Sequence, residues 1–204
     1  MYGDAEKGWQ RMDIGHQMYA LCAKLFPICR SITGDGVRET LDILRDIVPG
    51  MTIHEVPTGT PVFDWMVPKE WNIRDAWIKN SKGEKILDFK ETNLHVMGYS
   101  LPVNKKVTLD ELLPLIYTQP DQPDVIPYVT SYYKERYGFC MTQRQKDALC
   151  DDTYHIYIDS TLQDGSLTYG EILIPVRKER KMRFFSPLMF VIHLWPIMNF
   201  PARP

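Results

Sequence analysis

The segment from Tyr154 to Pro175 constrains the fold of this chain more than any other. It reads Tyr-His-Ile-Tyr-Ile-Asp over 154–159 and Leu-Thr-Tyr-Gly-Glu-Ile-Leu-Ile over 167–174, so β-branched and aromatic residues fill both arms. Asp164-Gly165 lies between the arms, and this dipeptide favours the positive φ angles of a tight turn. We therefore predict a β-hairpin at this point of the chain.

The chain changes character after Pro175. A basic cluster, Arg177–Arg183, is followed by an apolar run that Pro187 and Pro196 interrupt. The apolar part, 184–198, is shorter than the roughly 20 residues that a helix needs to cross a bilayer. Between a membrane anchor and a disordered or aggregation-prone extension, the prolines and His193 favour the extension.

Overall composition argues against several classes of partner. The 204 residues are 44% hydrophobic and 25% charged, which is ordinary for a globular protein of one large or two small domains. The net charge is −2, and no basic stripe interleaved with aromatic residues occurs before Pro175. We expect neither nucleic acid nor a membrane as a partner.

The N-terminal sequence predicts a cytoplasmic location, and the spacing of the cysteines predicts their chemical state. The N-terminus, Met1–Glu6, lacks the basic and apolar regions of a secretory signal. The four cysteines, Cys22, Cys29, Cys140 and Cys150, have neither zinc-knuckle nor Cys-x-x-Cys spacing. Reduced, mostly buried thiols are therefore expected.

The first fifty residues predict two helices. Apolar residues recur at three-to-four spacing over Trp9–Phe26 and stop at Pro27, and a second helix follows and ends at Pro49-Gly50. The glycine-bearing loop Thr33–Gly36 opens that second helix. A phosphate site there is one interpretation, but Asp35 would repel a phosphate, so capping of the helix by Asp35 or Gly36 is favoured.

The middle of the chain predicts a small β-rich unit. Residues 51–140 are rich in Pro, Trp and Tyr, and the capping box Thr108–Glu111 announces one short helix within them. A polar helix capped by Thr142 follows. The expected strands are 52–56, 73–79, 85–88 and 94–97.

No constellation of side chains predicts a catalytic centre. The ligand types have no pairing that would bring them to one metal ion, and no Gly-x-Ser-x-Gly elbow exists. Ser160 and Ser166 are interpreted as turn residues. The side chains of a type that could bind a metal are His54, Glu55, Asp64, His95, Asp151 and Asp152. Five aromatic residues could line a groove, but a place in the core is favoured; they are Trp65, Trp71, Trp77, Tyr132 and Tyr133. We assign no catalytic, cofactor-binding or metal-binding residue.

Four long segments resemble a family of bacterial zinc-aminopeptidase-like proteins associated with polysaccharide biosynthesis. One of them reads Leu-Phe-Pro-Ile-Cys-Arg-Ser-Ile-Thr-Gly-Asp-Gly-Val-Arg-Glu-Thr-Leu over 25–41. The others are 62–76, 127–140 and 158–171, and the likeness covers most of residues 9–175.

The resemblance implies a mixed α/β fold in which a zinc-hydrolase core carries an inserted β-rich domain. Residues 1–50 would be N-terminal helices of that core, 51–140 the insert, and 141–175 the return to the core as a helix and first β-hairpin. In such enzymes zinc activates a water molecule and a carboxylate acts as general base on a peptide or related amide.

The resemblance also implies that the zinc ligands would follow Pro175, in a pattern Thr-His-x-Cys-His-Pro-Ser that is not present in frame. Reading the codons of Pro187–Leu194 one base out of frame permits Thr-His-Val-Cys-His-Pro-Ser, and the Met189 and Phe190 codons then allow valine alone. We interpret residues 176–204 as a frameshifted tail. The chain is then the N-terminal fragment of a zinc-dependent hydrolase, inactive alone and without zinc; the alternative is a non-catalytic binding or scaffold module in surface polysaccharide biosynthesis.

Overall fold

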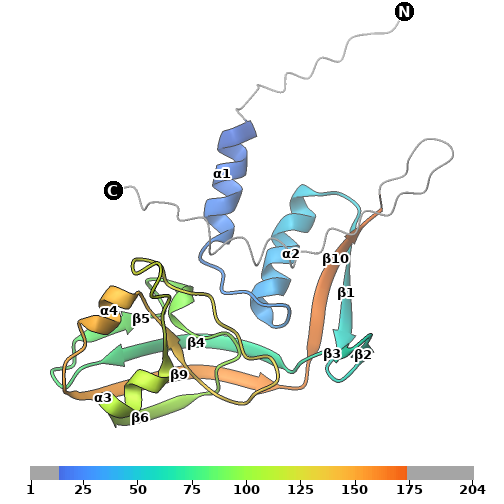
Figure 1. Cartoon of the computed structure of the whole chain (residues 1–204). Helices are drawn as coiled ribbons and strands as arrows, with labels where there is room; N and C mark the ends of the chain where they lie inside the picture. Colours follow the sequence, from blue (N-terminus) through green and yellow to red (C-terminus); the bar gives the residue numbers. More distant parts are fainter. Residues whose placement is uncertain (1–13, 174–204) are drawn as a thin grey trace, which may run out of the picture.

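The structure, a computed structural model, describes residues 14–173. The predicted tail and the part of the predicted first helix before residue 14 lie outside these residues. Figure 1 shows two parts, which we call the ribbon unit and the sheet unit. Both helices and strands contribute to the described residues, which confirms the mixed α/β class.

The ribbon unit consists of two helices and two long strands. Its elements are α1 (Ile14–Leu25), α2 (Asp35–Ile47), β1 (Met51–Pro57) and β10 (Ser166–Ile172). β1 and β10 pair antiparallel, and α2 packs on them where Gly170 faces Leu41. A Cβ atom at Gly170 would lie 3.0 Å from Leu41 Cδ2, so glycine permits this close approach of helix and strand.

The sheet unit, residues 70–163, is built on four antiparallel strands in the order β5-β4-β9-β6. The strands are β4 (Glu70–Lys79), β5 (Lys85–Asp88), β6 (Val103–Thr108) and β9 (Thr153–Gln163). Side chains alternate across the sheet, so Ile156 and Ile158 are buried while His155 and Tyr157 lie on the other face. One face of the sheet therefore carries the core.

Short elements cover the buried face. They are η1 (Asn93–His95), α3 (Leu109–Leu112), η2 (Leu113–Leu115), β7 (Ile116–Tyr117), β8 (Phe139–Cys140) and α4 (Gln143–Asp147). The predicted capping box at Thr108 and the predicted cap at Thr142 are both present and begin α3 and α4, and the cap at Thr142 is a capping box as well. The small hairpin of β2 (Pro61–Val62) and β3 (Trp65–Met66) lies between the ribbon and the sheet unit in the sequence.

The predicted hairpin at 154–174 is wrong in its pairing. Both arms are strands, but β9 pairs with β4 and β6 while β10 pairs with β1, so the chain passes from one unit to the other between them. Gly165 is not among the glycines with positive φ. A Cβ atom there would lie 2.4 Å from Glu70 Oε2, so close approach of the Glu70 side chain is what requires this glycine.

The expected domain bounds stay a prediction; in the structure β9 is a central strand of the four-stranded sheet, and β1 pairs with β10 in the ribbon unit. The strand expected at 94–97 is wrong, because this segment begins with the 3-10 helix η1 and Val96 makes an isolated bridge. The N-cap of α2 is Gly34, not Asp35 or Gly36, and the Asn72 side-chain oxygen accepts a hydrogen bond from the Asp35 backbone N–H at 2.7 Å. The first backbone N–H of α2 is therefore capped by a side chain of strand β4. None of the helices within 14–173 has the length and apolar character that a membrane span requires.

Candidate functional site

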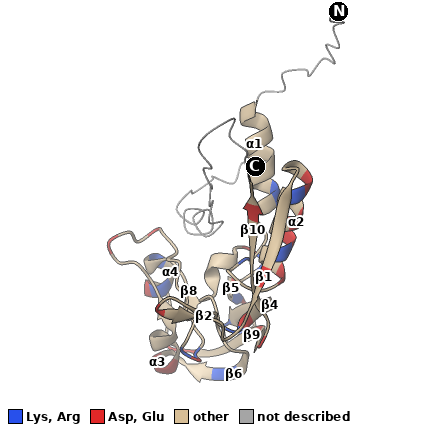
Figure 2. Ribbon diagram, turned by 90° about the vertical axis from the view of Figure 1, so that its right-hand side faces the viewer, with Lys and Arg blue, Asp and Glu red and all other residues tan. Residues whose placement is uncertain are grey.

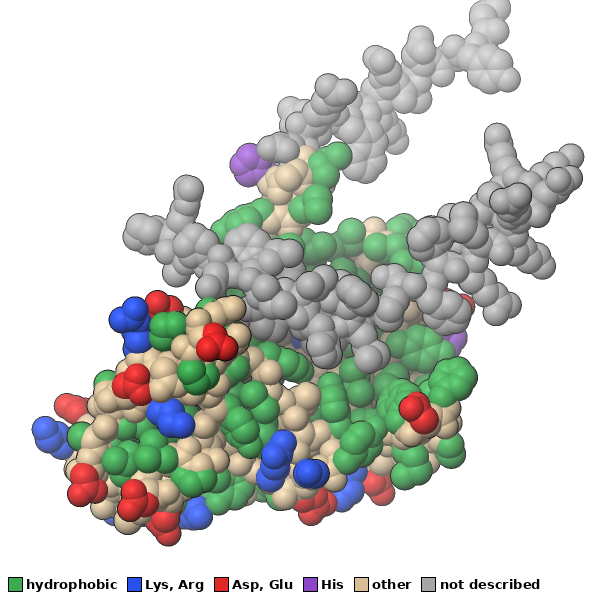
Figure 3. Space-filling view, viewed as in Figure 1, with side chains coloured by type: hydrophobic (Ala, Val, Ile, Leu, Met, Phe, Trp, Pro, Cys, Tyr) green, Lys and Arg blue, Asp and Glu red, His purple; other side chains and the backbone are tan. Residues whose placement is uncertain are grey.

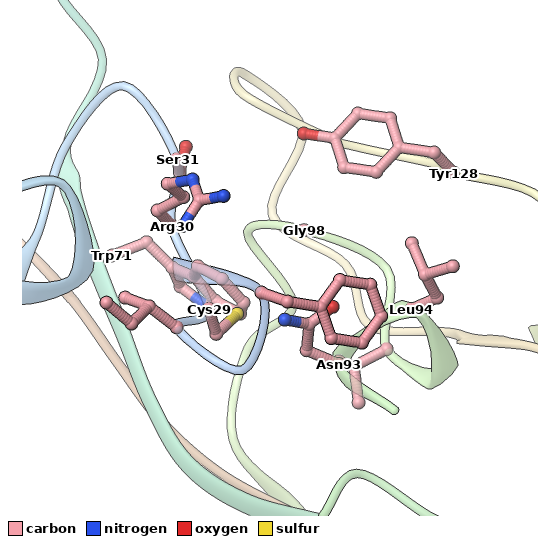
Figure 4. A pocket seen from close by; sticks show the side chains of 11 residues that line it. Cys29, Arg30, Ser31, Trp71, Asn93, Leu94, Gly98 and Tyr128 are labelled. Atoms are coloured by element: carbon pink, nitrogen blue, oxygen red, sulfur yellow. The ribbon is translucent and has the colours of Figure 1, made fainter. Parts of the chain in front are cut away.

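A small cavity lies where the loop after α1 meets the sheet unit (Figure 4). Its volume is about 70 Å³. The loop, strand β4, the segment around η1 and the chain at Tyr128 each contribute walls. The lining residues are Phe26, Ile28, Cys29, Arg30, Ser31, Trp71, Asn93, Leu94, Val96, Gly98 and Tyr128.

The two reactive-looking side chains of this cavity are not poised for catalysis. Burial raises the pKa of the Cys29 thiol to about 12, so the thiol stays protonated and is a poor nucleophile. Burial also lowers the pKa of Arg30, whose Nη1 donates to the Leu25 carbonyl at 2.6 Å. Arg30 thus holds the end of α1 against the loop.

Tyr99 ties this loop to the sheet unit. Its hydroxyl accepts a hydrogen bond from Ser31 Oγ at 3.0 Å and lies 2.6 Å from Thr33 Oγ1. The ring stacks on Trp71, with centroids 5.7 Å apart, and burial raises the pKa of Tyr99 to about 12. Its backbone has φ of 67°, which is unfavourable for tyrosine. A neutral, buried hydroxyl with two partners is an anchor, not a general base.

Glu70 makes the second connection between the units. Arg38 of α2 donates from Nη1 to Glu70 Oε2 at 3.1 Å, and the Ser166 backbone N–H donates to the same oxygen at 3.1 Å. Asn72 donates to the other carboxylate oxygen at 3.2 Å. Hydrogen bonding from Arg38 lowers the pKa of Glu70, so the carboxylate is charged and fully engaged.

A larger depression of about 710 Å³ adjoins the small cavity and shares Ile28, Cys29, Ser31 and Trp71 with it. Acidic, amide, hydroxyl and basic side chains line its walls. These polar residues are Asp35, Glu39, Asn72, Arg74, Thr161 and Gln163. Such a lining can hydrogen-bond a polar ligand, but it brings no nucleophile and base together.

The ligand types considered from the sequence lie on separate elements. His54 is on β1, where it stacks on Tyr169, and its Nε2 is 3.2 Å from Glu171 Oε2. His95 is buried in η1 and its Nδ1 lies 2.9 Å from the Cys140 carbonyl oxygen. Burial lowers the pKa of His95, which favours the neutral ring.

The acids are equally dispersed. Asp64 is exposed in the β2–β3 turn, and Asp152 accepts hydrogen bonds from the Ser81 backbone and hydroxyl at 3.1 and 3.0 Å. Glu55 is exposed on β1 and Asp151 is exposed before β9. Over residues 14–173, no three His, Cys, Asp or Glu side chains converge as a metal-ligand set.

The serines and aromatic residues have structural surroundings. Ser160 lies inside β9, not in a turn, and donates to the Ser100 carbonyl at 2.7 Å. Ser166 begins β10. The aromatic side chains do not share one groove, because Trp71 lines the cavity whereas Trp77 stacks on the other sheet face.

The remaining aromatic side chains are also apart. Trp65 lies in β3, and Tyr132 packs on Tyr99 with centroids 4.7 Å apart. Tyr133 is exposed and its hydroxyl donates to the Met66 carbonyl at 2.8 Å.

Sequence reasoning missed the open face of the sheet. Trp77 and Tyr157 stack with ring centroids 5.0 Å apart, and the His155 ring lies 4.9 Å from that of Trp77. The sequence feature that could have indicated this face is the alternation of buried and exposed side chains over 153–163, which puts His155 and Tyr157 on the same side. It does not reveal that β4 is the neighbouring strand.

The sheet unit matches a known family model, and most of the chain is similar to a longer bacterial protein. The family model called Domain of unknown function (DUF2172) matches residues 70–161, which is nearly the whole sheet unit. A Clostridium acetobutylicum protein, named as a candidate polysaccharide biosynthesis protein with an aminopeptidase-like domain, is 62% identical over 162 residues. That match covers 79% of this chain and 37% of the relative.

A solved structure gives the same result. The crystal structure of a candidate peptidase from C. acetobutylicum matches with a TM-score of 0.74 and 63% identity, over 78% of this chain and 37% of that one. The chain therefore spans 37% of the length of each of these two proteins. The resemblance seen in the sequence is confirmed.

Proposed function

We propose that this chain, as a close likeness of aminopeptidase-like proteins of polysaccharide biosynthesis, is the N-terminal part of a zinc-dependent hydrolase. The observation that carries the proposal is the 62% identity over 162 residues to a relative whose name includes an aminopeptidase-like domain. Identity at this level, together with the TM-score of 0.74, supports a common fold for the shared part. The substrate class proposed is a peptide or a related amide.

The described residues do not fit a zinc site of their own. Zinc requires three or four ligands at one point, and the candidate donors His54, His95 and Asp152 lie on separate elements with other partners. When bound, zinc would polarise the scissile carbonyl and activate water. We therefore place its ligands in the portion of the longer relatives that this chain does not span, and we propose that the chain alone is inactive.

The role proposed for the described residues is to hold the sheet unit at a defined position on the hydrolase. Glu70 with Arg38, and Tyr99 with Ser31 and Thr33, fasten the sheet unit to the ribbon unit at two points. Because both connections are buried or partly buried, they restrict rotation between the units. The polar depression beside them is the surface that a substrate reaching across the junction would contact.

The proposal also includes the frameshift at residues 176–204, outside the described part. The support is the codon argument, in which one base of slippage yields the expected Thr-His-x-Cys-His-Pro-Ser pattern. Sequencing the locus tests it: an open frame without a downstream aminopeptidase remnant would refute the slip. A cytoplasmic location is proposed as well, because the four cysteines are free thiols, as in reducing compartments.

The test of the main proposal compares two proteins. One is the 204-residue chain, and the other, the joined protein, continues residues 1–175 with the segment of the Clostridium relative that follows its matched residues. Metal analysis and a panel of aminoacyl and peptidyl amides are applied to both. We expect bound zinc and turnover in the joined protein alone. Stoichiometric zinc in the 204-residue chain, or cleavage by it, would refute its inactivity. Absence of both zinc and turnover in the joined protein would refute the assignment as a hydrolase.

One observation favours a second function, that of a glycan-binding module. On the open sheet face, Lys79 Nζ lies 4.2 Å from the Trp77 ring centroid, and Asn104 Oδ1 is 2.7 Å from His155 Nε2. Stacked rings flanked by polar groups suit the C–H faces and hydroxyls of a sugar. Calorimetric titration with oligosaccharides tests this: Trp77→Ala should abolish binding and Tyr133→Ala, an exposed aromatic residue elsewhere, should not. An absence of binding to the wild-type chain rules this module out for the sugars used.

A further inference from the structure

Four basic residues lie side by side across the whole width of the sheet unit. Lys79 of β4 pairs with Lys85 of β5 on one side and with His155 of β9 on the other. His155 in turn pairs with Lys106 of β6, the strand at the edge of the sheet. We call these four residues the basic row, and Figure 2 shows the lysines of β6 in blue at that edge. Like charges directly opposite one another destabilise a sheet, so the row requires compensating negative charge.

The basic row lies on the open face of the sheet. Lys79 Nζ lies 4.2 Å from the centroid of the Trp77 ring, and the His155 ring lies 4.9 Å from the same ring. Lys106 is exposed and follows Asn104 by two residues, so strand alternation places both side chains on one face. That face is the open one, because Asn104 Oδ1 lies 2.7 Å from His155 Nε2.

The acids of the same face already have cationic partners. The pairs are Asp159 with Arg74, Asp88 with Lys85, and Asp75 with Lys90, the last at 3.9 Å. Asp88 therefore neutralises one end of the basic row, at Lys85. Among the residues that the structure describes, no Asp or Glu forms an ion pair with Lys79 or Lys106. The positive charges that remain are at these two lysines.

Protection of the sheet edge does not explain the whole row. Lysines on an edge strand discourage pairing with another chain, and this accounts for Lys105 and Lys106 of β6. β4 lies between β5 and β9, however, so Lys79 protects no edge. The contact of Lys79 with the Trp77 ring is attractive but leaves the positive charge uncompensated. The charge of Lys79 therefore fits an anionic ligand better than a structural role.

The neighbouring row of the same face is aromatic. Trp77 pairs with Tyr157, their ring centroids are 5.0 Å apart, and Tyr157 pairs with Asn104. Successive rows on one face of a strand are roughly 7 Å apart, so a ligand unit of the size of one sugar can contact both rows. Such a unit needs an anionic group next to a C–H face and hydroxyls. A uronic acid sugar carries all three on one ring.

We propose that the open face of the sheet unit binds an acidic polysaccharide built from uronic acid units. Its carboxylates contact Lys79 and Lys106, and its sugar rings contact Trp77 and Tyr157. This inference rests on the glycan-binding module proposed above and names the class of glycan. Lys79 and Lys106 are two strand spacings apart, about 10 Å at the backbone, which suits a chain with repeated carboxylates.

Other polyanions fit this surface less well. Nucleic acids and anionic membranes are bound by extended basic surfaces, whereas Asp75 and Asp159 lie directly beyond the aromatic row. Figure 3 shows charged side chains of both signs interspersed over the side of the molecule that it presents. A small group of positive charges beside aromatic rings favours a ligand that carries few charges and also offers ring faces.

Calorimetric titration of the 204-residue chain tests the proposal. The probes are oligomers of galacturonate and of glucuronate, each compared with its carboxyl-reduced form, which is the matching neutral sugar. We expect the acidic form of at least one oligomer to bind, and the reduced form to bind at least about tenfold more weakly. Affinity for the acidic form should fall as salt is added, because salt screens exposed charges. Equal affinities for the two forms would overturn the proposal.

Three lysine variants locate the charge that matters. Lys79→Met and Lys106→Met remove the charge and keep an unbranched apolar chain; each should weaken binding about threefold, and the two together about tenfold. Lys105→Met is the matched control. It makes the same change in net charge one residue away, but Lys105 Nζ lies over the Tyr137 ring, 5.7 Å from its centroid, on the covered face. Its effect should stay below about twofold, and an effect equal to that of Lys106→Met would show that only net charge is sensed and that the site is wrong.

Failure of this inference and failure of the glycan module give different results. Equal binding of acidic and reduced oligomers that is lost in Trp77→Ala and retained in the lysine variants keeps the module and removes its preference for acidic glycans. Absence of binding to every oligomer removes both. Binding to phosphatidylserine vesicles or to single-stranded DNA as tight as to the oligouronates identifies a surface that follows negative charge alone, and it overturns the assignment to a glycan.

Discussion

The sheet unit and the ribbon unit differ in how far each completes its own core. The core cluster of buried apolar side chains lies entirely between Ala76 and Ile158, within the sheet unit. In the ribbon unit the buried apolar residues are few, and they are Leu25, Ile32, Val37 and Leu41. Large apolar side chains such as Met18 and Leu173 remain exposed there. One unit buries most of its apolar side chains internally, and the other leaves several of them exposed.

The comparison predicts very unequal effects of truncating apolar side chains. Phe139 is fully buried in the sheet unit, so Phe139→Ala should lower the free energy of unfolding by about 3–5 kcal/mol. Met18→Ala in α1 should change it by less than about 0.5 kcal/mol, because the side chain is mostly exposed. Urea melts of both variants measure the difference. Similar losses would mean that α1 is packed in solution and that the contrast between the units is wrong.

The connection between the units should depend on one carboxylate. Glu70→Gln removes a charged acceptor that is 10% exposed and bonded to Arg38, Ser166 and Asn72, and we expect a loss of about 1.5–3 kcal/mol. Asp35→Asn is the matched control, since Asp35 pairs with the same Arg38 but is 82% exposed. Its effect should stay below about 1 kcal/mol. Equal effects in urea melts would show that burial does not distinguish the two pairs.

The same carboxylate gives a pH dependence with a defined sign. Arg38 lowers the pKa of Glu70 in the folded protein, so the folded state holds the ionised form more strongly than the unfolded state does. The stabilisation is complete above the unfolded pKa, about 4.3, and disappears as pH falls through the lower folded value. The difference in stability between wild type and Glu70→Gln should therefore shrink in acid. A difference that is constant from pH 7 to pH 3 would contradict the ionic origin.

The sequence predicted local structure better than it predicted pairing. The capping box at Thr108 and the cap at Thr142 could be found because each cap lies within four residues of its partner. The partners of β9 and β10 could not, since Asp164-Gly165 fits a hairpin locally and the pairing is decided by burial of β9 between β4 and β6. Strand choice is a tertiary property, and local turn chemistry did not reveal it.

The candidate site was the least predictable part. Its anchors connect residues far apart in the chain, such as Tyr99 with Thr33 and Glu70 with Ser166. No spacing rule brings these residues together. The stacked face at Trp77 could be recognised only once the order of the strands was known, because its rings come from β4 and β9.

A small stabilising effect is predicted from the backbone at Phe63. Within the described residues, the two non-glycine positions with positive φ are Phe63, at 52°, and Tyr99, at 67°. Tyr99 is buried and bonded through its hydroxyl, so packing holds its strained backbone, whereas the Phe63 side chain is fully exposed and offers no such compensation. Phe63→Asn should therefore raise the free energy of unfolding by up to about 1 kcal/mol, because asparagine tolerates the left-handed region better.

The counterpart of that substitution is Tyr99→Phe, which keeps the strained backbone and removes the hydroxyl bonded to Ser31 and Thr33. It should lower stability by about 1–2 kcal/mol, since both partners then lose a buried hydrogen bond. Opposite signs for the two variants in parallel urea melts would show that strain is compensated in the sheet unit and uncompensated at the exposed hairpin. If Phe63→Asn also destabilises, the Phe63 ring makes contacts that its exposure does not indicate, and strain at this position is compensated after all.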